Sequence, residues 1–258
     1  MIKAIFPPFL LILICILFWK EGEVAWEAAS LWHPLGTDEF GRDMLSVLCA
    51  SMLISAFKGV LLSLLATIVG ILAGYCMILL ESKIASGIVG LLTLVVESIP
   101  LLLWIMVMII VLPIPSIVLI LAFSIGTLPF VSRIVAGEID RLRSQPFFEA
   151  SRLCGASKLR CTIRHILPNA MPVLAPLAVQ LCGAGAAADG VFGLIGLGNR
   201  INLDIGTLLL RGKENVLLHP ELIIYAILTV ALLYFYFWYA FLTFSQKKLD
   251  DSTDRILI

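Results

Sequence analysis

Side chains that could act as acids, bases or metal ligands are few in this sequence, and they do not gather. Glu97 interrupts the apolar run VVESIPLLL, and Asp189 follows the small-residue run GAGAAA. Catalysis needs cooperating groups, but no histidine lies in the apolar run around Glu97, and no Ser/His pairing accompanies it. We therefore expect no catalytic site, no metal site and no cofactor. No ligand-like spacing occurs among the histidines and cysteines, which are His33, His165, His219, Cys15, Cys49, Cys76, Cys154, Cys161 and Cys182.

The elements that must position Glu97 and Asp189 are apolar helices. The chain is 60% hydrophobic and only 14% charged, against about a quarter charged in soluble domains. Eighteen basic and eighteen acidic residues cancel, so nothing favours nucleic acid as a partner. Runs of about 17–25 apolar residues recur, each long enough to cross a membrane as a helix. We predict an all-α polytopic membrane protein with about six transmembrane helices, at 4–19, 59–80, 84–112, 116–135, 166–188 and 221–244.

Two of these spans carry special features. The first is short and follows Lys3, so it is either a transmembrane helix or the apolar region of a signal peptide cleaved near Ala28. The third is long and contains Pro100, which predicts a kinked or tilted helix. Along the fifth, the prolines at 168, 172 and 176 recur every four residues and predict a local bend. This bend is either a hinge or a static fit.

Basic residues in the loops orient the predicted bundle. With the N-terminus in the cytoplasm, twelve basic residues lie inside, namely Lys3, Lys83, Arg133, Arg141, Arg143, Arg152, Lys158, Arg160, Arg164, Lys247, Lys248 and Arg255. Six lie outside, namely Lys20, Arg42, Lys58, Arg200, Arg211 and Lys213. The bias predicts that both termini are cytoplasmic.

The predicted topology divides the chain into three parts. Residues 1–58 form the first span and an extracytoplasmic segment. Residues 59–245 form a transmembrane core that includes a long inner loop at 133–168, and residues 246–258 form a cytoplasmic tail.

The inner loop contains SQPFFEASRLCGAS, which predicts a short amphipathic helix. Pro146 suits a first helical turn, Glu149 favours the positive end of the helix dipole, and Gly155 supplies a left-handed stop. Phe147, Phe148 and Leu153 are its apolar contacts. So short a helix is marginal alone in water, so it needs the membrane surface, its own bundle or a partner protein to pack against.

This segment resembles the EAA signature of ABC importer permeases. Glu149-Ala150-Ser151 is followed by Gly155 and later by Leu167-Pro168, with Ser151 in place of the second alanine. His165 stands where isoleucine is usual. The longer string FFEASRLCGASKLRCTIRHILPNAMP is similar to the branch that imports dipeptides, oligopeptides and nickel. HPLGTDEFGRD at 33–43 and GLIGLG at 193–198 resemble two further motifs of that branch.

The resemblance implies a permease subunit in a bacterial inner membrane. It implies a second permease subunit in a heterodimer, two cytoplasmic ATPases and an extracytoplasmic binding protein as partners, besides membrane lipid. The substrate would be a small peptide, or alternatively nickel or a metal chelate. ATPase coupling would fall to Phe147, Phe148, Glu149, Ala150, Ser151, Leu153 and Gly155.

The residues themselves agree with part of this expectation. No GxxxxGK[ST] sequence is present, so ATP hydrolysis is expected on separate subunits and the chain is not expected to be an enzyme. An intramembrane enzyme and a membrane scaffold are the competing classes. The short helix could also lie on lipid rather than in an ATPase groove.

Glu97 and Asp189 are the candidates for the translocation path. A carboxylate within a span usually faces a cavity or a partner, although Glu97 could also be a protonated packing residue. Asp189 is expected at the end of the fifth span, near the outer mouth. Gly70 and Gly74 form a GxxxG face that predicts close helix packing, as does the run 183–188.

HPLGTDEFGRD contains turn formers and charge. Gly36 and Gly41 permit tight turns, and Asp38 is expected to cap a helix that begins near Glu39 and runs along the outer surface to about Phe57. The segment is expected to be a brace between the first two spans, with contact to a binding protein as the alternative. The sequence differs from the branch between 199 and 220, where Ile205-Gly206 replaces its usual Trp-Gly.

Overall fold

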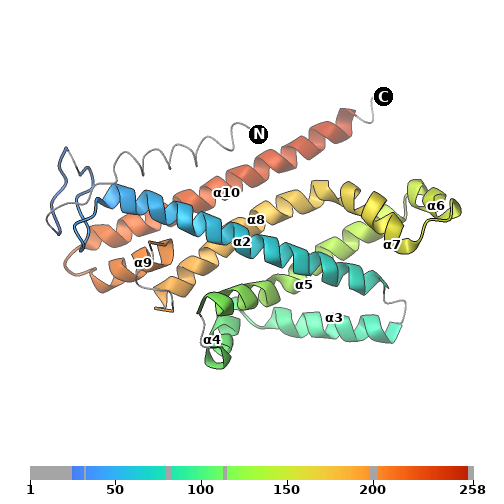
Figure 1. The fold of residues 1–258 in the computed structure, drawn as a ribbon, viewed down its shortest axis with the longest axis horizontal. Helices are drawn as coiled ribbons and strands as arrows, with labels where there is room; N and C mark the ends of the chain where they lie inside the picture. The colour runs from blue at the N-terminus through green and yellow to red at the C-terminus, as the bar shows by residue number, and fades with distance from the viewer. Residues whose placement is uncertain (1–24, 32, 80–82, 113–114, 198–202, 255–258) are drawn as a thin grey trace. The chain divides into compact units, whose positions relative to one another are not determined.

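Long apolar runs with few helix breakers fold into long helices in this protein. The computed structural model describes residues 25–31, 33–79, 83–112, 115–197 and 203–254, and within these ranges the regular structure is helical (Figure 1). The helices are α2 (Met44–Leu79), α3 (Lys83–Ser98), α4 (Leu101–Val111), α5 (Pro115–Arg143), α6 (Pro146–Leu153), α7 (Lys158–Cys161), a π-helical turn η1 (Thr162–Ile166), α8 (Leu167–Leu194), α9 (Ile205–Glu214) and α10 (Pro220–Asp254).

Four described helical segments are long and apolar enough to cross a membrane. They are Met44–Tyr75, Ile117–Arg143, Thr162–Leu194 and Pro220–Ser245. A broken pair, Gly90–Ser98 with Leu102–Val111, meets the same criteria when its halves are counted together. The predicted all-α membrane fold is confirmed. The span expected at 4–19 lies outside the described residues, so the number six stays a prediction.

The start of α2 differs from the sequence prediction. Asp43, not Asp38, caps the helix: its carboxylate accepts from the Ser46 N–H at 2.9 Å and from the Ser46 hydroxyl at 3.0 Å. The helix then continues without interruption to Leu79. Within residues 33–79, the expected surface helix and the span form one helix, and its first turns carry apolar residues such as Val47, which packs with Leu208 and Ala226.

Pro100 breaks the third predicted span more sharply than a kink. It has no N–H to continue the helical ladder and it restricts the preceding residue, so α3 ends at Ser98 and α4 begins at Leu101. The axes of the two halves differ by 96°. Glu97, which was expected near the middle of a span, instead lies at the end of α3, next to this break.

The chain divides into two compact units. Unit 1 contains residues 1–60 and 183–240, and unit 2 contains residues 61–182 and 241–258. In unit 2, the predicted GxxxG contact is present. A Cβ atom on Gly70 would lie 2.2 Å from a Val131 side-chain atom, and one on Gly74 would lie 2.8 Å from the Ser132 carbonyl oxygen. Because neither glycine has a side chain, the backbone of α2 can lie directly against α5 at these two positions.

Unit 1 uses glycine in the same way where α8 meets α9. A Cβ atom on Gly193 would lie 2.4 Å from the Cα of Gly206, and one on Gly206 would lie 2.7 Å from the Cα of Gly193. Gly183, from the predicted small-residue run, allows Phe237 of α10 to come within 3.2 Å of its Cβ position. The first glycine of GLIGLG, Gly193, thus meets Gly206 at one helix crossing.

The inner loop predicted at 133–168 is largely helical. α5 continues to Arg143, and only two residues separate it from α6. The turn before α8 is π-helical, with the Leu167 N–H bonded to the Thr162 carbonyl. Pro168 cannot donate to the preceding turn, which accounts for an irregularity at the bend expected there. Pro172 and Pro176 follow inside α8.

Candidate functional site

The short helix α6 is held against the rest of unit 2 by its two phenylalanines, of which Phe148 is the more deeply buried. Phe148 is 9% exposed and joins the core cluster that includes Val135, Cys161 and Ile166. The Arg143 guanidinium lies 5.9 Å from the centre of the Phe148 ring. Phe147 is half-buried against the same cluster. Both rings therefore anchor α6 to its own subunit, which is one of the three packing surfaces that the sequence left open.

The opposite face of α6 is open. Glu149 and Ala150 are exposed, and Leu153 is 89% exposed at the end of the helix. Glu149 occupies the first turn and Arg152 the last, which suits the helix dipole. The result is a small apolar patch, centred on Leu153 and flanked by charge, that the subunit itself does not cover.

Gly155 ends α6 in the left-handed conformation that the sequence predicts. Its φ is +83°. The Gly155 N–H bonds to the Arg152 carbonyl at 2.9 Å, and the Ala156 N–H bonds to the Ser151 carbonyl at 3.3 Å, which is a Schellman arrangement. A Cβ on Gly155 would meet open space, so the backbone conformation, not crowding, requires glycine.

Ser151, the residue that departs from the EAA pattern, connects α6 to the following turn. Its hydroxyl lies 2.8 Å from the Cys161 thiol, which is fully buried. An alanine at this position could not make that contact. Cys154, in contrast, is exposed.

Glu97 is half-exposed and ion-paired. Its carboxylate pairs with the Arg133 guanidinium of α5, and the two side chains are 48% and 50% exposed, respectively. The Arg133 Nε also donates to the Pro129 carbonyl at 3.3 Å. The pair therefore connects the end of α3 to the interior of α5 within unit 2. About half of each side chain stays accessible to further partners.

Asp189 has the opposite environment. It lies inside α8, five residues before the helix ends, and is 3% exposed. Lys58 donates to it at 3.0 Å and to Asp204 at 2.5 Å, so one lysine serves two buried carboxylates. Ser55 adds a hydrogen bond to Asp189 at 3.2 Å and accepts from the Ile205 N–H at 3.0 Å.

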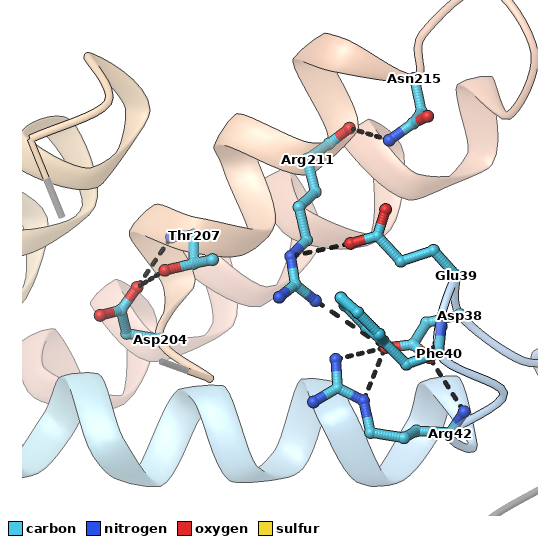
Figure 2. A network of polar contacts seen from close by, with 8 residues as sticks. All are labelled: Asp38, Glu39, Phe40, Arg42, Asp204, Thr207, Arg211 and Asn215. Atoms are coloured by element: carbon cyan, nitrogen blue, oxygen red, sulfur yellow. Dashed lines mark hydrogen bonds and ion pairs between the residues drawn. The ribbon is translucent and has the colours of Figure 1, made fainter. Parts of the chain in front are cut away.

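Asp204 fixes the start of α9 in this cluster. It accepts from the Thr207 N–H at 2.8 Å and from the Thr207 hydroxyl at 2.5 Å (Figure 2). Burial alone would raise the pKa of Asp204, but the hydrogen bonds from Lys58 and Thr207 outweigh it and hold that pKa below the ordinary value. Asp204 is therefore an ionised N-cap, and α2, α8 and α9 share one charged junction.

The segment HPLGTDEFGRD forms a second charged junction in unit 1. Asp38 accepts from the Phe40 and Arg42 N–H groups, each at 2.9 Å, and pairs with the Arg42 guanidinium. Arg211 of α9 approaches Asp38 at 3.8 Å and Glu39 at 3.3 Å, as Figure 2 shows. Burial lowers the pKa of Arg211, although an arginine stays cationic.

Phe40 occupies an unusual position in this junction. Its ring is 63% exposed, and the guanidinium carbons of Arg42 and Arg211 lie 4.8 Å and 4.9 Å from the ring centre. Gly36 and Gly41 take φ values of +77° and +73°, as the turn prediction requires. The segment connects α2 to α9. The first predicted span, which was expected to be its other contact, lies outside the described residues.

The apolar helices indicate a multi-pass membrane protein. Residues 66–250 match the family described as the binding-protein-dependent transport system inner membrane component. This match covers well over half of the chain, so the protein belongs to that family. The resemblance to importer permeases is confirmed.

Its relatives are named as peptide permeases. The chain is 30% identical over 139 residues to the oligopeptide transport system permease protein OppC of Bacillus subtilis, which covers 54% of this chain and 45% of OppC. It is 28% identical over 194 residues to the probable D,D-dipeptide permease DdpC of Escherichia coli, covering 72% of this chain and 62% of DdpC. The glutathione permease GsiD of Pectobacterium atrosepticum is 24% identical over 87% of this chain and 78% of its own length.

The fold has known counterparts. A chain of the inward-facing MetNI methionine ABC transporter superposes with a TM-score of 0.63 at 17% identity, covering 80% of this chain and 97% of that one. An amino acid ABC transporter chain gives 0.55 at 17% identity, covering 78% and 94%. At this identity the likeness shows the fold. The matched segments span about half to two thirds of the first two relatives.

Three charged residues of these sites were missed from the sequence. Lys58, Arg133 and Asp204 were treated only as loop charges or not at all, although each pairs with a candidate acid or its neighbour. A usable signal existed for two of them. Lys58 and Arg133 each interrupt an otherwise apolar run, and an intramembrane cation predicts an acidic partner.

Proposed function

We propose that this chain is a transmembrane permease subunit of an ABC importer that moves small peptides inward. The observation that carries the proposal is the open face of α6, with Leu153 89% exposed, in a chain that belongs to the permease family. Peptides are favoured over nickel or a metal chelate because the relatives described above are named for peptides or for glutathione.

In this proposal α6 docks into a groove of a cytoplasmic ATPase. Phe147 and Phe148 seat the helix on its own subunit, while Glu149, Ala150 and Leu153 face the partner. Short amphipathic helices commonly bind in apolar grooves of this kind. Ser151, through Cys161, and Gly155 fix the orientation of the helix. Movement of the ATPases would then reach α8 through the π-helical turn that joins α7 to it.

The remaining partners follow from the same role. We infer a heterodimer with a second permease subunit, two ATPase subunits and an extracytoplasmic binding protein, with both chain termini in the cytoplasm. The division into 1–58, a core at 59–245 and a tail at 246–258 belongs to that topology. Of the two acids expected on the path, Glu97 keeps this role, because it is half-exposed at a helix break. Asp189 instead anchors α9, because it is buried and paired.

The test is recovery of the ATPase on affinity-purified permease, together with ATP-dependent peptide uptake in proteoliposomes. Leu153→Asp places a charge on the open patch, and Glu149→Lys reverses the charge beside it. Both changes should reduce ATPase recovery and uptake while the permease still inserts. Gly155→Val should have the same effect, because a β-branched residue is strained at a φ of +83°.

Arg160→Ala is the matched control. Arg160 is exposed in α7, beyond the end of α6, so its loss should leave ATPase recovery near that of the parent protein. Full ATPase binding and uptake in Leu153→Asp and Glu149→Lys would show that α6 is not the coupling element.

A further inference from the structure

Glu97 and Arg133 are half-exposed charges within candidate membrane-spanning helices, Glu97 in Gly90–Ser98 and Arg133 in Ile117–Arg143. Arg133 precedes the end of α5 by ten residues, or about 15 Å of helix. Glu97 follows the start of α3 by fourteen residues, or about 21 Å. Charged side chains at such depth avoid lipid and face a water-filled cavity or a polar partner. Their exposure in the subunit therefore marks a surface that lipid does not cover.

The backbone beside the pair supports the same conclusion independently. The break between α3 and α4 leaves Ile99 and Pro100 non-helical, with Ile99 partly exposed and Pro100 exposed. Irregular backbone at membrane depth is tolerated where protein buries it or where it lines a water-filled cavity. Discontinuous helices of this kind commonly contribute to substrate sites in transporters. Both the charges and the broken backbone therefore mark a surface that lipid does not cover.

We propose that Glu97 and Arg133 form a subsite for the two ends of a short zwitterionic peptide. Glu97 would receive the α-ammonium group and Arg133 the α-carboxylate. This inference rests on the proposed function and names where its substrate binds.

The chemistry of the pair fits such a ligand. A half-exposed carboxylate has lone pairs beyond those used by one arginine, and a guanidinium has five N–H donors. The pair is neutral as a whole, so it can exchange its internal contact for contacts to a neutral zwitterion without leaving a charge unpaired. A dipeptide spans at most about 7 Å, which matches two neighbouring side chains rather than two distant ones.

The first experiment measures water access in the assembled importer. In a background without native cysteines, Glu97→Cys and Val95→Cys are exposed to a charged, membrane-impermeant thiol reagent, with and without millimolar L-alanyl-L-alanine. Val95 is 59% exposed on the other side of α3, where lipid contact is expected. We expect rapid labelling of the Glu97→Cys variant, protection by the peptide, and little labelling of Val95→Cys. Absence of labelling at position 97, or labelling that the peptide does not slow, overturns the proposal.

The second experiment measures uptake of L-alanyl-L-alanine per assembled importer. The double variant Glu97→Gln/Arg133→Gln should raise the peptide concentration for half-maximal uptake roughly tenfold, the scale of one charge-assisted hydrogen bond. Val95→Gln is the control and should not raise it. Unchanged uptake by the double variant would mean that the pair only connects α3 to α5. If the parent importer shows no ATP-dependent peptide uptake, the proposed function itself fails, and the subsite with it.

Discussion

Two charged clusters, one in each unit, are arranged in opposite ways. In unit 1, Asp189 and Asp204 are 3% and 2% exposed, and Lys58 and nearby hydroxyls satisfy both. In unit 2, Glu97 and Arg133 form a single pair with about half of each side chain exposed. We call the first cluster closed, because its carboxylates are buried and paired within the subunit. We call the second pair open, because half of each side chain is accessible from outside the subunit.

This difference separates structural charge from functional charge. Burying ions is costly unless each has partners, so a closed cluster is useful chiefly for fixing geometry, here the start of α9. A half-exposed pair gains little stability, and within candidate membrane spans it is not expected to face lipid. Its position is therefore better explained by a ligand or by water. The same contrast appears on α6, where Phe148 is closed against the core and Leu153 is open.

The largest effect is expected from opening the closed cluster. Lys58→Met would leave Asp189 and Asp204 buried without their shared cation, which should lower the free energy of unfolding by about 3 kcal/mol. Arg133→Met, in the open pair, should lower it by no more than about 1 kcal/mol. Chemical denaturation of the detergent-solubilised subunit measures both.

The comparison has an internal control. Lys58→Met combined with Asp189→Asn and Asp204→Asn removes the stranded charges and should recover part of the lost stability. Equal losses in Lys58→Met and Arg133→Met would break the distinction between the two units.

A second prediction compares a glycine whose Cβ position is crowded with one whose Cβ position is free. Gly74 lies against Ser132 and Val135, whereas Gly137, on α5, has nothing within 4 Å of its Cβ position. Gly74→Leu should therefore lower the free energy of unfolding by about 1–3 kcal/mol through overpacking. Gly137→Leu should not destabilise, since leucine is a better helix former than glycine. A melting temperature of Gly74→Leu equal to that of the parent would contradict the contact between α2 and α5.

Sequence reasoning was most successful where the physics is local. Hydropathy identified the apolar helices, and the requirement for positive φ placed the turn at Gly155. The break at Pro100 was also foreseen, although not its size, because the angle depends on how α4 packs against α5. The predicted start of α2 was wrong because Asp38 and Asp43, both aspartates, are equally good N-caps by residue type. The local turn, in which Asp38 accepts from Phe40 and Arg42 and Gly41 takes a positive φ, and the tertiary contact of Asp38 with Arg211 decide between them.

The candidate sites were less predictable for a related reason. Glu97 and Asp189 look alike in sequence, as single acids in apolar surroundings. Their environments differ because Lys58 and Arg133 approach from distant parts of the chain, at separations that no periodic pattern encodes. Likewise, the amphipathic pattern of α6 showed which residues are apolar but not which of them, Phe148 or Leu153, the subunit would bury.

The smallest predicted effect concerns Phe40, whose side chain is largely exposed but has contacts within the subunit. Its ring is 63% exposed, yet it lies between the guanidinium groups of Arg42 and Arg211. Exposed cation–π contacts contribute about 0.5–1 kcal/mol, and both arginines are already paired with Asp38. Phe40→Ala should therefore lower the free energy of unfolding by about 0.5–1 kcal/mol, while Phe40→Tyr keeps the ring and should change it little. Chemical denaturation at low and high salt measures both variants. A loss in Phe40→Ala as large as that in Lys58→Met would place Phe40 among the closed contacts, and no loss would show that the two arginines hold their positions without the ring.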